Sequence, residues 1–206
     1  MRVLGVFQIL RYALLAVLGL TVAGVVWSAV TFDASKQPWS CCCIELPEDR
    51  VKLTFCRRAA HPFLAEYERT IAIEQAGGRR TTSALPDDSG GVDWVDVYWV
   101  VPEWGSGPQV LLRDKWREYL VDPSTGDVRL IVRIGSGRVF AGPLMGGNAG
   151  ASVVTDSSGN VTVTVNGRPA EELTHIGIDT RREHLGRIIE DHGEPVFVAG
   201  GVGERE

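Results

Sequence analysis

The sequence lacks the motifs that mark common catalytic and metal-binding sites. It has no G-x-S-x-G nucleophile motif and no P-loop, and its Gly-Ser-Gly triplets at 105–107 and 135–137 are more typical of hairpin turns. The acidic residues form no D-x-D-x-D-G calcium ladder, and the four histidines contain no H-x-x-x-H pair. We therefore predict no catalytic residue, no cofactor and no metal ion.

An excess of basic residues is lacking in the part of the chain that follows the N-terminal apolar stretch, because acidic residues outnumber them there. Residues 1–32 carry two Arg and no acid, so their removal lowers the formal net charge from −5 to −7. Nucleic acids and anionic membrane surfaces are bound by clustered Lys and Arg. The acidic balance therefore predicts no nucleic-acid partner.

Charge is absent from one long stretch near the N-terminus. The uncharged run from Tyr12 to Phe32 has 21 residues, enough for a helix that crosses a hydrocarbon core of about 30 Å. A cleaved signal usually has a shorter apolar region, of about 7–15 residues, and a buried core helix is rarely so uniformly apolar. We predict a single-pass transmembrane helix at 12–32 in the lipid bilayer, an uncleaved signal anchor. A cleaved signal and a core helix are the alternatives.

The charges beside this run predict the membrane orientation. Arg11 directly precedes the run, and the free amino terminus adds a positive charge on the same side. The positive-inside rule then favours a short cytoplasmic tail at 1–11 and a domain outside the cytoplasm, either periplasmic or extracellular. Lys36, Arg50 and Lys52 follow the run and weaken this preference.

Cysteine is scarce, and its four residues are unusually placed. Cys41, Cys42 and Cys43 are consecutive, and Cys56 follows. In an oxidising compartment the favoured disulfide joins Cys56 to one of the other three, because adjacent cysteines reach disulfide geometry poorly. Two thiols would remain and could cross-link two chains near the membrane. In a cytosolic segment the cysteines would instead suggest S-palmitoylation, and their spacing is not the C-x₂-C of a zinc site.

The remaining chain reads as one domain. Residues 33–47 are predicted to connect it to the membrane helix, since Pro38 and Pro47 argue against a continued helix. We place a single β-rich domain at 48–199, which is an ordinary domain size, and a disordered tail at 200–206.

Short alternating segments separated by Gly, Pro, Asp and Ser turns indicate β-strands. Alternation is clear at 50–56, and residues 92–101 are apolar on both faces, which predicts a central strand. Residues 179–191 suit either a helix or a hairpin, and Gly186 with unfavourably placed charges favours the hairpin. The predicted fold class is mainly β, an antiparallel sandwich or barrel-like meander, preceded by one N-terminal transmembrane helix.

The sequence resembles no known family, so its function is predicted only in broad terms. We favour a membrane-tethered interaction or scaffolding module that binds a protein partner or itself, with Trp104 as a candidate exposed contact. An envelope enzyme or ligand-binding protein is the alternative. Its site would be assembled from distant residues such as His61, Asp87 or Asp88, and His175.

Overall fold

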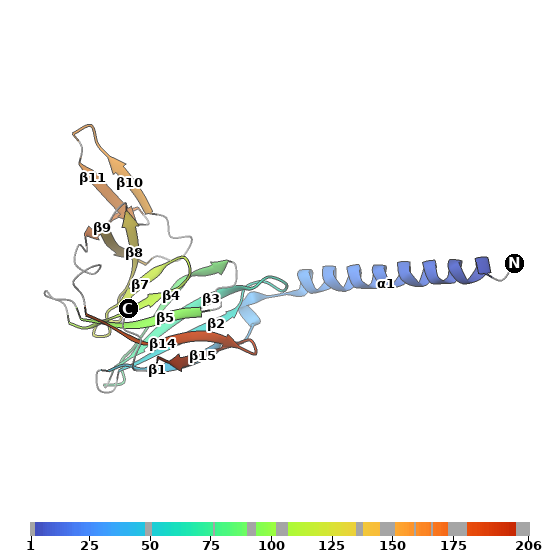
Figure 1. Cartoon of the computed structure of the whole chain (residues 1–206), viewed down its shortest axis with the longest axis horizontal. Coiled ribbons are helices and arrows are strands. Elements are labelled where there is room, and N and C mark those ends of the chain that lie inside the picture. Colours follow the sequence, from blue (N-terminus) through green and yellow to red (C-terminus); the bar gives the residue numbers. More distant parts are fainter. Residues whose placement is uncertain are drawn as a thin grey trace.

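The computed structural model describes most of the chain. It covers residues 3–47, 51–75, 77–89, 94–101, 107–134, 138–144, 151–158, 160–165, 167–172 and 181–200. One helix, α1 (Val3–Thr31), extends away from a β-rich domain (Figure 1). Its segment Leu10–Thr31 is long and apolar enough to cross a membrane, and none of it is buried against the domain.

A short 3-10 helix, η1 (Ala34–Lys36), separates α1 from the strands. The described residues then form fifteen strands, which are β1 (Ser40–Glu45), β2 (Lys52–Ala59), β3 (Glu66–Glu74), β4 (Arg80–Ser89), β5 (Trp94–Val101), β6 (Gln109–Arg113), β7 (Glu118–Val121), β8 (Val128–Ile134), β9 (Arg138–Pro143), β10 (Ala151–Thr155), β11 (Val161–Val165), β12 (Arg168–Pro169), β13 (Glu171–Glu172), β14 (Arg181–Asp191) and β15 (Glu194–Ala199).

These strands form three sheets, in which every described pairing is antiparallel. The small sheet has the order β1-β2-β3-β4 and the large sheet the order β13-β9-β8-β7-β6-β5-β14-β15. The strands β10, β11 and β12 form a separate hairpin-like sheet that projects from the body of the domain (Figure 1).

The core lies between the small and the large sheet. Alternating side chains of both sheets meet in one buried cluster, which includes Leu53 and Phe55 from β2, and Val97 and Trp99 from β5. A second buried cluster lies on the opposite face of the large sheet, around Leu111. Antiparallel sheets around a shared apolar layer confirm the predicted mainly β fold class.

Two strand predictions are confirmed in detail. The strand β5 lies inside the large sheet between β6 and β14, and it buries side chains on both faces. Residues 181–191, part of the segment for which the sequence allowed a helix or a hairpin, form the first strand of the hairpin β14–β15. This hairpin turns at His192 and Gly193. Gly186 occupies a β-bulge at φ 152°, where an added Cβ would lie 2.3 Å from the carbonyl oxygen of Val198. A side chain does not fit at this position, which explains why it is occupied by glycine.

The N-terminal border of the domain differs from the prediction. Residues 33–47 were expected to connect helix and domain, but Ser40–Glu45 form the strand β1, paired along its whole length with β2. Alternation accounts for the pairing, because Cys42 and Ile44 face the core and Cys41 and Cys43 face outward. The expected disordered tail, apart from Gly200, lies outside the described residues.

A buried ion pair joins the two main sheets. Arg69 on β3 donates to Asp114 at 3.0 Å, and these side chains are only 3% and 2% exposed. The same guanidinium donates to the Pro86 carbonyl on β4 and to the hydroxyl of Tyr119. Asp114 also accepts two backbone N–H groups of its own turn. Every charge is therefore compensated, as burial demands.

Removal of one partner of this pair should strongly destabilise the fold. For Asp114→Ala in the full chain we expect a loss of about 3–5 kcal/mol in the free energy of unfolding, because Arg69 would remain buried without its counter-ion. The measurement is denaturant unfolding in detergent. The control Glu45→Ala breaks the exposed pair with Lys52 and should cost less than about 1 kcal/mol. Equal losses in the two variants would contradict this account.

Candidate functional site

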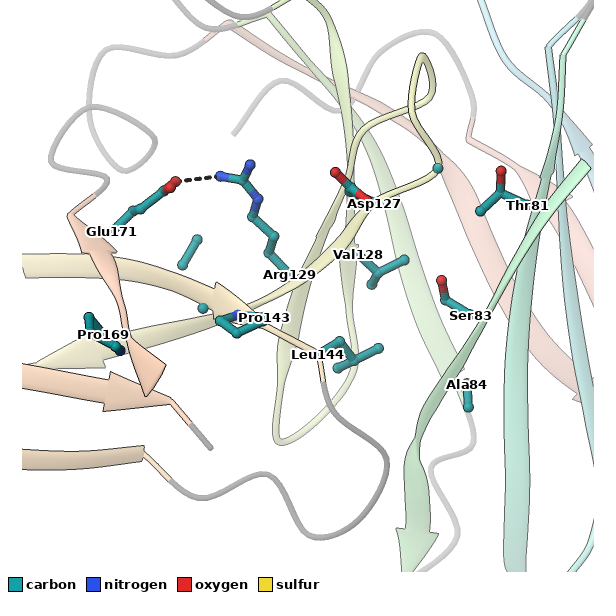
Figure 2. Close-up of a pocket in the computed structure, with 13 residues that line it drawn as sticks. Thr81, Ser83, Ala84, Asp127, Val128, Arg129, Pro143, Leu144, Pro169 and Glu171 are labelled. Atoms are coloured by element: carbon teal, nitrogen blue, oxygen red, sulfur yellow. Dashed lines mark hydrogen bonds and ion pairs between the residues drawn. The ribbon is translucent and has the colours of Figure 1, made fainter. Parts of the chain in front are cut away.

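A groove of about 500 Å³ lies between the small sheet and one end of the large sheet (Figure 2). One wall is the strand β4, and the other is built mainly by β8, β9 and the residues that follow β9. The lining residues are Thr81, Ser83, Ala84, Gly126, Asp127, Val128, Arg129, Ala141, Gly142, Pro143, Leu144, Pro169 and Glu171. The walls therefore combine apolar side chains with two hydroxyl groups.

The strand β4 is an edge of the small sheet. Among the described residues it pairs only with β3, on the side away from the groove. In an antiparallel pair, alternate residues direct their backbone N–H and C=O groups away from the partner. Along Thr81–Leu85 no described residue outside β3 forms a backbone hydrogen bond with these groups, which is the usual property of an edge strand.

Close packing forms the wall opposite β4. Gly142 on β9 lies beneath Val165 of β11, and an added Cβ would lie 2.3 Å from the Val165 Cβ. Val165 is completely buried and joins the main core. The absence of a side chain at Gly142 therefore lets the projecting hairpin pack directly against the groove wall.

The turn between β7 and β8 closes one end of the groove. Gly126 adopts φ 79° and approaches Thr81 so closely that a Cβ would lie 2.5 Å away. Gln75 binds this turn to the small sheet by donating to the carbonyl oxygens of Pro123 and Ser124. The end of the groove is thus built from both sheets.

Asp122 organises the same turn. Its carboxylate accepts hydrogen bonds from the backbone and hydroxyl of Ser124 and from the backbone of Thr125. Partial burial alone would raise the pKa of Asp122, but these hydrogen bonds outweigh burial and lower the pKa below its ordinary value. The turn thus favours an ionised Asp122, and the Pro, Gly and Asp composition of 122–127 is typical of such a turn.

The charged rim of the groove is exposed. Arg129 donates to Glu171 at 2.7 Å, and the two side chains are 41% and 71% exposed (Figure 2). An ion pair with this much solvent contributes little to stability. It leaves both ends of the pair accessible to polar groups of a ligand.

The chain matches no protein-family model, and no curated protein or solved structure matches it significantly. Its function therefore has to be inferred from the groove and the surfaces of the chain itself.

The described lining contains hydroxyl groups and carboxylates at separate places. It includes the hydroxyl groups of Thr81 and Ser83 but no histidine, cysteine or lysine that could activate them. The two acids, Asp127 and Glu171, are exposed at the rim. In the described part of the chain no group of three His, Cys, Asp or Glu side chains could hold a metal ion.

The cysteines lie outside the groove, on the small sheet. Cys41 and Cys56 are direct neighbours on β1 and β2, and they form a disulfide with a Cα–Cα distance of 4.1 Å. Cys42 packs against the core, and burial raises the pKa of its thiol to about 11. Cys43 is free and exposed. A disulfide at Cys56 was predicted, but its partner depended on strand register.

The other residues proposed from the sequence do not meet in the groove. Trp104 and His175 lie outside the described residues, as do the side chains of Asp87 and Asp88. His61 lies in the turn after β2, where its Nδ1 accepts the backbone N–H groups of two following residues. The enzyme alternative thus gains no assembled site among the described residues.

One contact between distant residues could not be predicted from the sequence. His184 on β14 lies beside Asp96 on β5, with 3.4 Å between Nε2 and the carboxylate. Asp96 is buried and is paired mainly with Arg187 at 2.5 Å. The two strands bring these residues together from almost ninety positions apart, so no local spacing could reveal them. These residues lie away from the groove. Arg187 compensates the buried negative charge of Asp96.

Substitution of Gly142 should disturb the groove wall. We expect Gly142→Ala to lower the free energy of unfolding by about 1–3 kcal/mol, because its methyl group would overlap Val165. Denaturant unfolding of the full chain in detergent measures this. Gly107→Ala is the matched control, since an added Cβ meets nothing within 4 Å there. Unchanged stability of Gly142→Ala would rule out the close packing described above.

Proposed function

We propose that this protein is a membrane-tethered domain outside the cytoplasm that binds an extended segment of a partner protein along β4. The edge of β4 beside the groove, which no strand among the described residues covers, is the observation that carries the proposal. In this binding mode the backbone of the added segment pairs with the edge strand, and its alternate side chains enter neighbouring pockets.

The groove suits small apolar side chains. Val128, Pro143 and Leu144 form its apolar surface, and Thr81 and Ser83 offer hydroxyl groups close to the backbone of β4. Arg129 and Glu171 at the rim can each bind a polar or charged group of the segment. The partner could be a different protein or a second copy of this chain.

Two features support the tether and its orientation. The apolar helix α1 has the length of a membrane span, and Arg11 directly precedes its uncharged run. A disulfide between Cys41 and Cys56 suits an oxidising compartment. Together they favour a domain that faces the periplasm or the cell exterior.

An impermeant maleimide tests the orientation. On intact cells we expect it to label Cys43 quickly, because this thiol is exposed, and Cys42 only slowly. With a pKa of about 11, only about one Cys42 thiol in ten thousand is ionised at pH 7. Labelling is read by mass spectrometry of the intact chain. Absence of labelling until the membrane is opened would place the domain in the cytoplasm.

Photo-cross-linking tests the binding edge. With p-benzoylphenylalanine in place of Ala84 in the full chain, we expect a discrete protein adduct in the native membrane, because Ala84 is exposed beside the groove. Adding Ser83→Lys should abolish the adduct, since a lysine on an edge strand opposes strand addition.

The matched control for this experiment is Ser152→Lys, which places the same charge on the exposed surface of β10. This variant should retain the adduct. An adduct that survives Ser83→Lys, or the absence of any adduct, would contradict binding along β4. Unfolding midpoints of both variants show whether each remains folded.

A further inference from the structure

Three large apolar side chains are exposed at the end of the domain that joins α1. They are Trp39, Phe63 and Leu64, which are 41%, 52% and 55% exposed. Trp39 precedes β1, and the other two lie in the loop between β2 and β3. We call Trp39 together with residues 60–65 the tip.

Strand register places the two parts of the tip at the same end. Ser40, the first residue of β1, pairs with Arg57, and β2 continues for two more residues to Ala59. The loop therefore extends past the start of β1, toward the side from which α1 enters the domain. Figure 1 shows this end of β2 and β3 facing the helix.

The loop has a defined conformation. The Nδ1 atom of His61 accepts hydrogen bonds from the backbone N–H groups of Phe63 at 3.2 Å and Leu64 at 3.1 Å. The His61 ring also contacts the Phe63 ring edge-on, with 6.1 Å between the centroids. One side chain thus stabilises the turn that exposes two apolar neighbours.

The tip is held close to the end of α1. Arg58 donates to the carbonyl oxygen of Ser35 at 3.1 Å and lies over the Trp39 ring at 4.7 Å. Ser35 is four residues beyond the last residue of α1, so the two lie at most about 14 Å apart. The polar layer on each side of a bilayer is about 5–8 Å thick.

The charges near the tip are mixed. Lys36 and Arg58 are basic, but Asp33 and Glu68 pair with them, and the nearby turn of the hairpin β14–β15 carries exposed acids. Arg57 binds this turn through Glu190 and the carbonyl oxygen of Gly193. A surface of this kind has no net attraction to anionic lipids, so its apolar side chains must supply the affinity.

We propose that the tip docks on the same bilayer that α1 spans. Phe63 and Leu64 enter the boundary between headgroups and acyl chains, and Trp39 lies at the level of the headgroups, where tryptophan is enriched. This inference rests on the proposed membrane tether. It adds that the domain has a fixed face toward the lipid.

Docking also determines which part of β4 faces away from the membrane. Thr81 and Ser83 pair with Ile73 and Ile71, and these pair with Leu53 and Phe55 in the first half of β2. That is the end of the small sheet opposite to the tip. The groove therefore opens far from the lipid, where a soluble partner can reach it.

Photo-cross-linking to lipid tests the docking directly. The full chain is placed in phosphatidylcholine nanodiscs with p-benzoylphenylalanine at one position, either Phe63, Leu18 in α1, or Val154 on the projecting hairpin. Val154 is the matched control, because it is 59% exposed but lies away from the tip. Mass spectrometry then detects a protein–lipid adduct.

Docking predicts lipid adducts at positions 63 and 18 and none at 154. Adding Leu64→Asp to the chain with the probe at 63 should remove most of its lipid adduct, while the same substitution leaves the adduct at 18 unchanged. An adduct at 18 without one at 63 would overturn the docking and leave the tether intact. Absence of both adducts would refute the tether as well. A cross-link from 63 to a second copy of the chain would overturn docking in favour of self-association.

Discussion

The arrangement of the domain depends on the buried ion pair between Arg69 and Asp114. Its guanidinium reaches Asp114 on the large sheet and the Pro86 carbonyl on β4 at the same time. The apolar core gives the two sheets a common interior but is not directional. A charged hydrogen-bonded contact is directional, so it sets where β4 lies relative to β6 and β7. The groove lies along the part of β4 that precedes Pro86.

The N-terminal end of the domain has a comparable organisation around arginine. Arg58 connects the segment after α1 to β2, and Arg57 connects β2 to the β14–β15 turn. The disulfide between Cys41 and Cys56 joins β1 to β2, and Cys56 directly precedes Arg57 in the chain. The apolar helix α1 therefore joins the domain through a segment that is hydrogen-bonded to β2 rather than through a long free linker.

Local patterns in the chain predicted much of the fold and little of the candidate site. The two apolar faces of residues 92–101 predicted a central strand, and Gly186 favoured the hairpin that β14 and β15 form. The groove was not anticipated, because Thr81 and Ser83 look like ordinary residues of a polar strand. Their significance comes from Gly142 and Val165, which approach from the other sheet and the projecting hairpin. The spacing of residues along the chain cannot reveal contacts between segments that are so far apart in the sequence.

The sequence by itself determined the apolar N-terminal helix and the antiparallel β class, and it favoured the hairpin β14–β15. These depend on hydrophobic periodicity and turn chemistry, which act over a few residues. The tertiary structure alone decided that Cys41 is the partner of Cys56, that β4 is an edge strand among the described residues and that Asp96 lies beside His184. Each of these depends on strand register and sheet order, which arise from packing between residues far apart in the chain.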